Sequence, residues 1–144
     1  MLNPLGVGIS TSVSLPGGVL TYTGNNTGQN NSLYTWVPTY STAGAVLAVG
    51  GGAGGNPGGS SGGGGGDGGS VITNRLIQFD ANTTYFITVG MGGAAGIYGI
   101  SYGSFGGSTT LVGGGNSITA PGGSGARAAS TGGFGNGGVN TSFG

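Results

Sequence analysis

Glycine limits what this chain can fold into more than any other residue, because it is both abundant and unevenly placed. Of the 144 residues, 41 are glycine; residues 50–69 hold 14 of them, whereas residues 70–89 hold none. Glycine costs about 1 kcal/mol per position in a helix, relative to alanine. No apolar stripe of helical period survives between the glycine patches. The distribution therefore predicts strands that alternate with glycine-rich segments.

Strand patterns lie between the glycine patches. The glycine-free window predicts a β-hairpin across residues 71–89, because turn residues at 80–83 separate two runs rich in β-branched and aromatic residues. Further strands are expected within residues 15–22, 33–37, 45–49, 109–112 and 117–120. The expected fold is all-β, with short antiparallel strands, glycine-rich loops and essentially no α-helix.

The glycine tract at residues 50–69 has two interpretations. It is either a flexible linker or a set of polyproline II-type helices that pack where only hydrogen fits between backbones. Polyproline II helices have no internal hydrogen bonds, so buried ones must bond to their neighbours. Glycine patches recur between the strand patterns instead of forming a single spacer, and this favours the packed interpretation.

The length of the chain suits one domain. The alternation of strand patterns and glycine patches divides it into two regions. Residues 34–144 are expected to form a glycine-rich β domain. Residues 1–33 are expected to form an N-terminal strand or arm region, with contacts between subunits as one alternative.

Four charged residues make up the whole inventory of charge: Arg75, Arg127, Asp67 and Asp80, with no Lys, Glu, His or Cys. Serine and threonine therefore have no base to activate them, and no Cys or His is present for a zinc or iron–sulfur site. Two arginines cannot neutralise a row of phosphates. We expect no enzyme, no cofactor, no metal and no nucleic-acid partner.

One short stretch resembles a calcium-binding repeat. Residues 62–67 fit the start of a GGxGxD nonapeptide, but no second copy follows. Stacked calcium turns need such neighbours. The sequence favours Asp67 as a turn or solubility residue.

Aromatic and asparagine residues give the candidate contact surface. Residues 96–107 (GIYGISYGSFGG) place Tyr98, Tyr102 and Phe105 among glycines. These rings either stack on sugars and on other copies of the chain, or cover bare glycine backbone and fill the core, the second alternative being favoured. Asn25 and Asn30 lie in the polar stretch GNNTGQNN, which predicts a surface loop or a binding loop.

Low charge and moderate hydropathy together predict self-association. The net charge is zero, and 35% of residues are hydrophobic; the mean hydropathy is +0.16. Such a chain is not kept apart by charge repulsion. The most apolar stretch, residues 43–55, is shorter than the roughly 18–20 residues of a membrane span, and no secretory signal is apparent at the N-terminus.

A family pattern runs along the chain. It comprises residues 34–38 (YTWVP), 45–55 (AVLAVGGGAGG), 83–93 (TTYFITVGMGG) and 106–110 (GGSTT), and residues 137–144 (GGVNTSFG) echo the last element. Over residues 34–144 the chain resembles the glycine-rich domain of bacteriophage tail-fibre and other virion surface proteins. The resemblance implies a small β-structured domain used in assembly or attachment, and no catalytic residues.

Three functions follow as expectations. The first is a structural protein, a self-assembling subunit of a virion surface or an extracellular fibre, whose main partner is itself. The second is an adhesin module that recognises a host-surface glycan or protein. The third is an ice-binding protein with a flat, uncharged, threonine-rich face. The expected location is the virion surface or the extracellular space.

Overall fold

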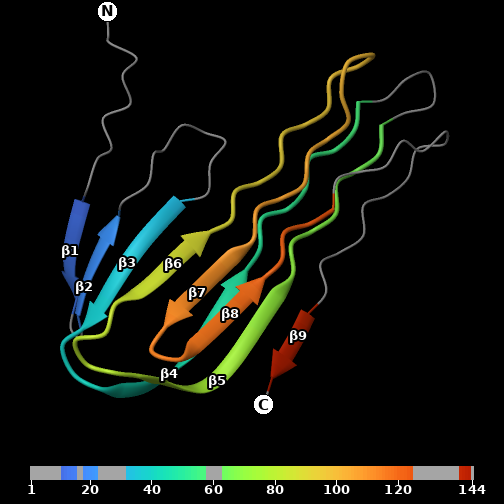
Figure 1. Ribbon diagram of the computed structural model, residues 1–144. Coiled ribbons are helices and arrows are strands. Elements are labelled where there is room, and N and C mark those ends of the chain that lie inside the picture. The colour runs from blue at the N-terminus through green and yellow to red at the C-terminus, as the bar shows by residue number, and fades with distance from the viewer. Residues whose placement is uncertain (1–10, 16–17, 23–31, 58–62, 125–139, 144) are drawn as a thin grey trace, which may run out of the picture.

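The fold is described from a computed structural model of the chain. The described residues are 11–15, 18–22, 32–57, 63–124 and 140–143. Within them the chain is all-β, with no helix, which confirms the expected fold class. Figure 1 shows two layers of strands that continue into five glycine-rich segments at one end of the molecule.

The larger layer is a six-stranded antiparallel sheet in the order β1-β2-β3-β6-β7-β8. Its strands are β1 (Thr11–Leu15), β2 (Gly18–Tyr22), β3 (Ser32–Pro38), β6 (Tyr85–Val89), β7 (Thr109–Gly113) and β8 (Asn116–Ala120). β1 and β2 thus extend the sheet that contains β3. The division of the chain at residues 33/34 stays a prediction.

The smaller layer is a three-stranded sheet in the order β4-β5-β9. Its strands are β4 (Thr42–Val49), β5 (Val71–Phe79) and β9 (Asn140–Phe143). The pairing of β4 with β5 is antiparallel and contains a register shift, where Leu76 adopts a left-handed φ of 66°. β5 and β9 run parallel, so the expectation of antiparallel strands fails for this pair, whose second strand arrives from a distant part of the chain.

The core lies between the two layers, where strand alternation brings apolar side chains inward. Its buried members come from both sheets: Ala48, Ile72, Ile77, Phe79, Tyr85, Leu111, Ile118 and Ala120. Tyr85 is fully buried, and its hydroxyl accepts a hydrogen bond from the Asp80 amide at 2.8 Å. The phenol therefore fills the core without leaving its oxygen unpaired.

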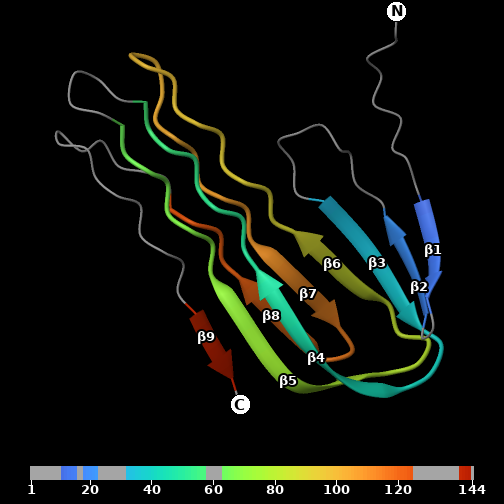
Figure 2. The ribbon, with the colours of Figure 1, turned by 180° about the vertical axis from the view of Figure 1, so that it is seen from behind.

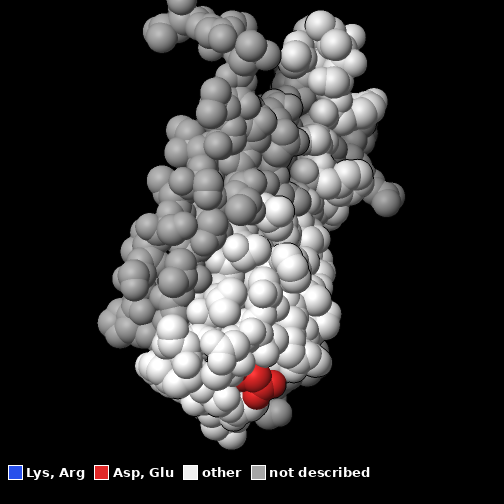
Figure 3. Space-filling view, turned by 60° about the vertical axis from the view of Figure 1, so that its left-hand side comes forward, with Lys and Arg blue, Asp and Glu red and all other residues white. Residues whose placement is uncertain are grey.

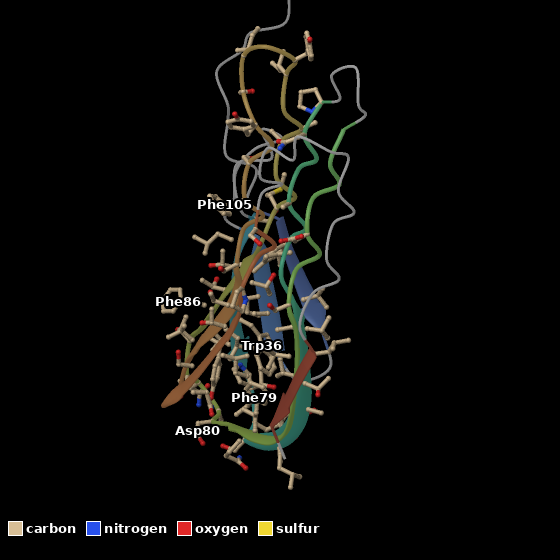
Figure 4. The ribbon with its side chains drawn as sticks, turned by 90° about the vertical axis from the view of Figure 1, so that its right-hand side faces the viewer. Trp36, Phe79, Asp80, Phe86 and Phe105 are labelled. Carbon is tan, nitrogen blue, oxygen red and sulfur yellow. The ribbon has the colours of Figure 1, made fainter. Side chains whose placement is uncertain are left out.

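Three aromatic rings join the two layers at the end away from the glycine segments (Figure 4). The ring centroid of Phe79, from the small sheet, lies 5.0 Å from that of Trp36 and 5.2 Å from that of Tyr85, both pairs in edge-to-face geometry. Trp36 and Tyr85 lie 5.7 Å apart. We call these three residues the aromatic cluster. Such edge-to-face pairs add to the free energy gained from burial alone.

The prediction of a β-hairpin across residues 71–89 is wrong. β5 and β6 are strands at the expected positions, but they belong to different sheets, and residues 80–84 cross from one layer to the other. The crossing is held by the Asn82 amide, which donates to the Pro38 carbonyl at 2.8 Å. Crossing places Phe79 and Tyr85 on opposite layers, so that their rings meet edge to face across the core.

The expected strands at residues 109–112 and 117–120 are confirmed. They form a β-hairpin whose turn has two residues. Gly113 pairs with Asn116. Gly114 and Gly115 have φ values of 55° and 77°. Two successive positive φ values are typical of the type I′ turn, which matches the twist of paired strands and favours glycine.

Candidate functional site

Beyond the sheets, the strands continue as five extended segments that we call the glycine bundle. Its members are residues 50–57, 63–70, 90–96, 103–108 and 121–124. In Figures 1 and 2 they run side by side away from the sheets and keep the two-layer order of the strands from which they come. We call residues 50–57, which continue β4, the central segment.

Hydrogen bonds of the central segment repeat at every third residue. Toward residues 63–70 the bonds are Gly50 N to Ser70 O at 2.9 Å, Ala53 N to Asp67 O at 2.8 Å and Asn56 N to Gly64 O at 2.8 Å. Toward residues 103–108 they are Gly51 N to Gly107 O and Gly54 N to Ser104 O, both at 2.9 Å. Toward residues 90–96 they are Gly93 N to Gly52 O and Gly96 N to Gly55 O, both at 2.8 Å.

Three successive residues of the central segment therefore bond to three different neighbours. A repeat of three residues is the period of polyproline II, and lateral bonding supplies what that helix lacks internally. The packed interpretation of the glycine tract thus describes residues 50–57 and 63–70, and the linker interpretation does not.

Most of the glycines that cannot carry a side chain recur with the same period, although the adjacent pairs Gly50 and Gly51 and Gly122 and Gly123 all overlap backbone as well. A Cβ built on Gly51 would overlap the Met91 carbonyl, and one built on Gly54 would overlap the Ala94 carbonyl. At Gly52, which lies between them, the nearest atom to such a Cβ is 3.7 Å away. Other glycines that would overlap backbone also occur three residues apart: Gly66 and Gly69; Gly90, Gly93 and Gly96; Gly103 and Gly106.

At the far end of the bundle, residues 97–102 form an exposed turn that we call the tip loop (Figure 1). The Ile97 amide donates to the Ser101 carbonyl at 3.0 Å, and the Ser101 amide donates back to Ile97 at 3.0 Å. Gly99, inside this turn, has a left-handed φ of 70° that favours glycine. The turn holds the loop in a compact, projecting shape.

Polar side chains fix the base of the tip loop. The Ala94 amide donates to the Ser104 hydroxyl at 2.7 Å, and the Gly103 amide donates to the Asn56 side-chain oxygen at 2.6 Å. The Ser104 amide also donates to the Ala94 carbonyl at 2.9 Å. The loop therefore emerges from a hydrogen-bonded base.

The candidate aromatic residues lie on the surface. Tyr98 and Tyr102 are 71% and 69% exposed, on the tip loop with exposed Ile97 and Ile100. Phe105 is 75% exposed and lies lower on the flank of the bundle, pointing outward on the same side as Phe86 (Figure 4). The alternative in which these rings fill the core is wrong, because the glycine segments pack on one another and leave no room for rings.

The other candidate residues are placed as follows. Asn25 and Asn30 lie outside the described residues. Of the two roles expected for Asp67, a turn or solubility residue, the turn is wrong: Asp67 lies within an extended segment, where its carboxylate accepts a hydrogen bond from the Ser124 hydroxyl. That bond ties residues 63–70 to 121–124. Among the described residues, no three His, Cys, Asp or Glu side chains gather as metal ligands would.

Charge is scarce on the described surface. Figure 3 shows one acidic patch, at the end away from the tip loop, and otherwise uncharged atoms among the described residues in that view. No helix in the described part of the chain could span a membrane. The tip loop offers apolar surface and two phenolic hydroxyls, and it carries no charged residue.

The sequence comparison agrees with this architecture. The family described as a glycine-rich domain matches residues 25–144. The chain belongs to this family. The glycine-rich domain thus covers β3 to β9 and the whole of the glycine bundle. No curated protein and no solved structure was found to match the chain.

Proposed function

We propose that this glycine-rich domain is a non-enzymatic structural subunit that assembles with copies of itself, at a virion surface or in an extracellular fibre. The observation that carries the proposal is the placement of apolar side chains. Among the described residues, thirteen large apolar side chains are exposed and eight apolar side chains are buried.

The exposed residues occur on several faces. Leu47, Val49 and Leu76 lie on the small sheet, and Phe86 pairs with Val112 on the outer face of the large sheet. Scattered exposed apolar residues are ordinary in proteins, but contiguous ones are typical of interaction surfaces. With a net charge of zero, nothing electrostatic opposes contact between copies. The likeness of residues 34–144 to virion surface proteins supports the location.

Self-assembly is tested on the purified chain. We expect the mass measured by analytical ultracentrifugation to exceed the 13.5 kDa of the monomer and to rise with protein concentration, as oligomers or polymers of the chain form. Negative-stain electron microscopy is expected to reveal regular particles or filaments. A monomer that persists at millimolar concentration, without ordered particles, would refute the proposal.

A second candidate function is adhesion, which the position of the tip loop favours. The loop projects at the free end of the bundle with its aromatic side chains exposed. Aromatic rings on a rigid loop can stack on sugar rings or pack on protein at small entropic cost.

Changing Tyr98 and Tyr102 together to alanine tests adhesion. Each lost ring removes about 0.5–1.5 kcal/mol of stacking beyond burial, so we expect binding to a glycan array to weaken by roughly tenfold or more. Tyr40→Ala is the matched control, since Tyr40 is also exposed but lies in the β3–β4 connection at the opposite end. If the double variant loses assembly together with binding, the structural function is preferred.

A further inference from the structure

The two sheets are unequal in width, and the difference leaves part of the larger one without a facing strand among the described residues. The six-stranded sheet faces a sheet of only three strands, which lies mainly over β7 and β8 and reaches β6 and β3 through Phe79, next to Tyr85 and Trp36. Figure 2 shows β1, β2 and β3 extending sideways beyond β4, with no described strand in front of β1 and β2. We call these three strands the overhang.

The backbone register of the core rows continues across the overhang. One row places Val13, Leu20, Trp36 and Tyr85 in register. The next row runs Thr11, Tyr22, Tyr34, Ile87, Leu111, Ile118. Residues opposite one another in an antiparallel sheet share a face, so the register positions of the overhang in these rows fall on the same side of the sheet as Tyr85 and Leu111. There, Tyr34 and Trp36 are only partly buried.

Two free strand edges border this uncovered face. In the order of the described strands, β1 ends the large sheet and β4 ends the small one. Neither strand contains a charged residue or a proline, the residues with which natural proteins commonly guard an edge. The last carbonyl of β4, Val49 O, accepts from the Thr109 hydroxyl at 2.6 Å, so a partner strand would pair with the residues before it.

We propose that the overhang is the contact between two copies of this chain, each of which completes the sandwich of the other. The inner face of one overhang packs on that of its partner, and the edge of β1 pairs with the edge of β4 in the other copy. The inference rests on the proposed self-assembly and names its surface. A second copy fits because it brings a matching apolar face and both missing edges at once, in an isologous contact.

The directions of the strands fix how the two copies are oriented relative to each other. β1 and β4 run in opposite directions in the molecule (Figure 1). They pair antiparallel between copies only if the twofold axis runs along the strands. Both glycine bundles then point the same way, and the two tip loops project from one end of the dimer.

Tyr34→Arg tests this interface, with Thr35→Arg as its matched control. Tyr34 stands in register with Ile87 on the inner face, whereas its neighbour Thr35 stands in register with the exposed Phe86 on the outer face. An unpaired guanidinium in an apolar contact is strongly unfavourable, and the symmetry introduces it twice. We expect the dissociation constant, measured by ultracentrifugation, to rise about a hundredfold or more for Tyr34→Arg and to change less than threefold for Thr35→Arg.

Hydrogen exchange of the unaltered chain provides a second measurement, which stands even if Tyr34→Arg fails to fold. We expect amides of β1 and β4 to exchange at least tenfold more slowly as concentration rises, while those of β7 stay constant. If the chain assembles but these amides do not change, or only Thr35→Arg blocks assembly, the overhang is not the interface and self-assembly still stands. If the unaltered chain stays monomeric, both proposals are overturned.

Discussion

Replacing Gly54 with alanine is expected to destabilise the folded chain by about 3 kcal/mol or more, a large share of the 5–15 kcal/mol typical of a domain. The added Cβ would overlap the Ala94 carbonyl. A carbonyl of the backbone cannot swing aside as a flexible side chain can. The central segment must therefore move away from residues 90–96, which weakens the 2.8 Å bonds that the Gly93 and Gly96 amides donate to the Gly52 and Gly55 carbonyls.

Gly52→Ala is the matched control, because Gly52 lies two residues earlier in the same segment. A Cβ at Gly52 has its nearest neighbour, the Asp67 carbonyl, 3.7 Å away, and Gly52 does not have a left-handed φ. We expect this variant to lie within about 1 kcal/mol of the original, since alanine also reduces the entropy of the unfolded chain. Urea unfolding followed by circular dichroism measures both variants. Equal stability of the two would contradict the three-residue packing.

Replacing Phe79 with alanine is expected to cost about 3–5 kcal/mol, the usual range for a phenylalanine removed from a core. Phe79 is 6% exposed and contacts both other members of the aromatic cluster, so its loss opens a cavity between the two sheets. The remaining rings, Trp36 and Tyr85, both belong to the large sheet. They cannot restore the link to β5.

Phe86→Ala makes the same chemical change seven residues later, on the outer face. Phe86 is 52% exposed, so we expect a loss of no more than about 1 kcal/mol. Thermal unfolding monitored by the fluorescence of Trp36, the single tryptophan, compares the two variants. If Phe86→Ala proves as destabilising as Phe79→Ala, then Phe79 is not what joins the sheets.

The candidate site was identified in part from the sequence. Tyr98 and Tyr102 stood out because aromatic residues among glycines are uncommon, but their pattern did not distinguish a buried ring from an exposed one. Exposure depends on where the surrounding glycines pack. The exposed Ile97 and Ile100 were missed, although their place beside the tyrosines in residues 96–107 could have indicated them. The overhang had no sequence signature, since its strands alternate like any other.

The sequence by itself determined the all-β class and the positions of most strands, and it favoured packed glycine segments over a linker, because these follow from local backbone preference and side-chain period. It did not indicate β1 or β9. It placed β7 and β8 correctly, since the glycine turn between them is too short for anything but a hairpin. Only the tertiary structure decided that β5 and β6 lie in different sheets, because the same turn residues serve a hairpin and a crossing. It also decided that Gly54 is indispensable and Gly52 is not, since that depends on a carbonyl forty residues away that no local pattern records.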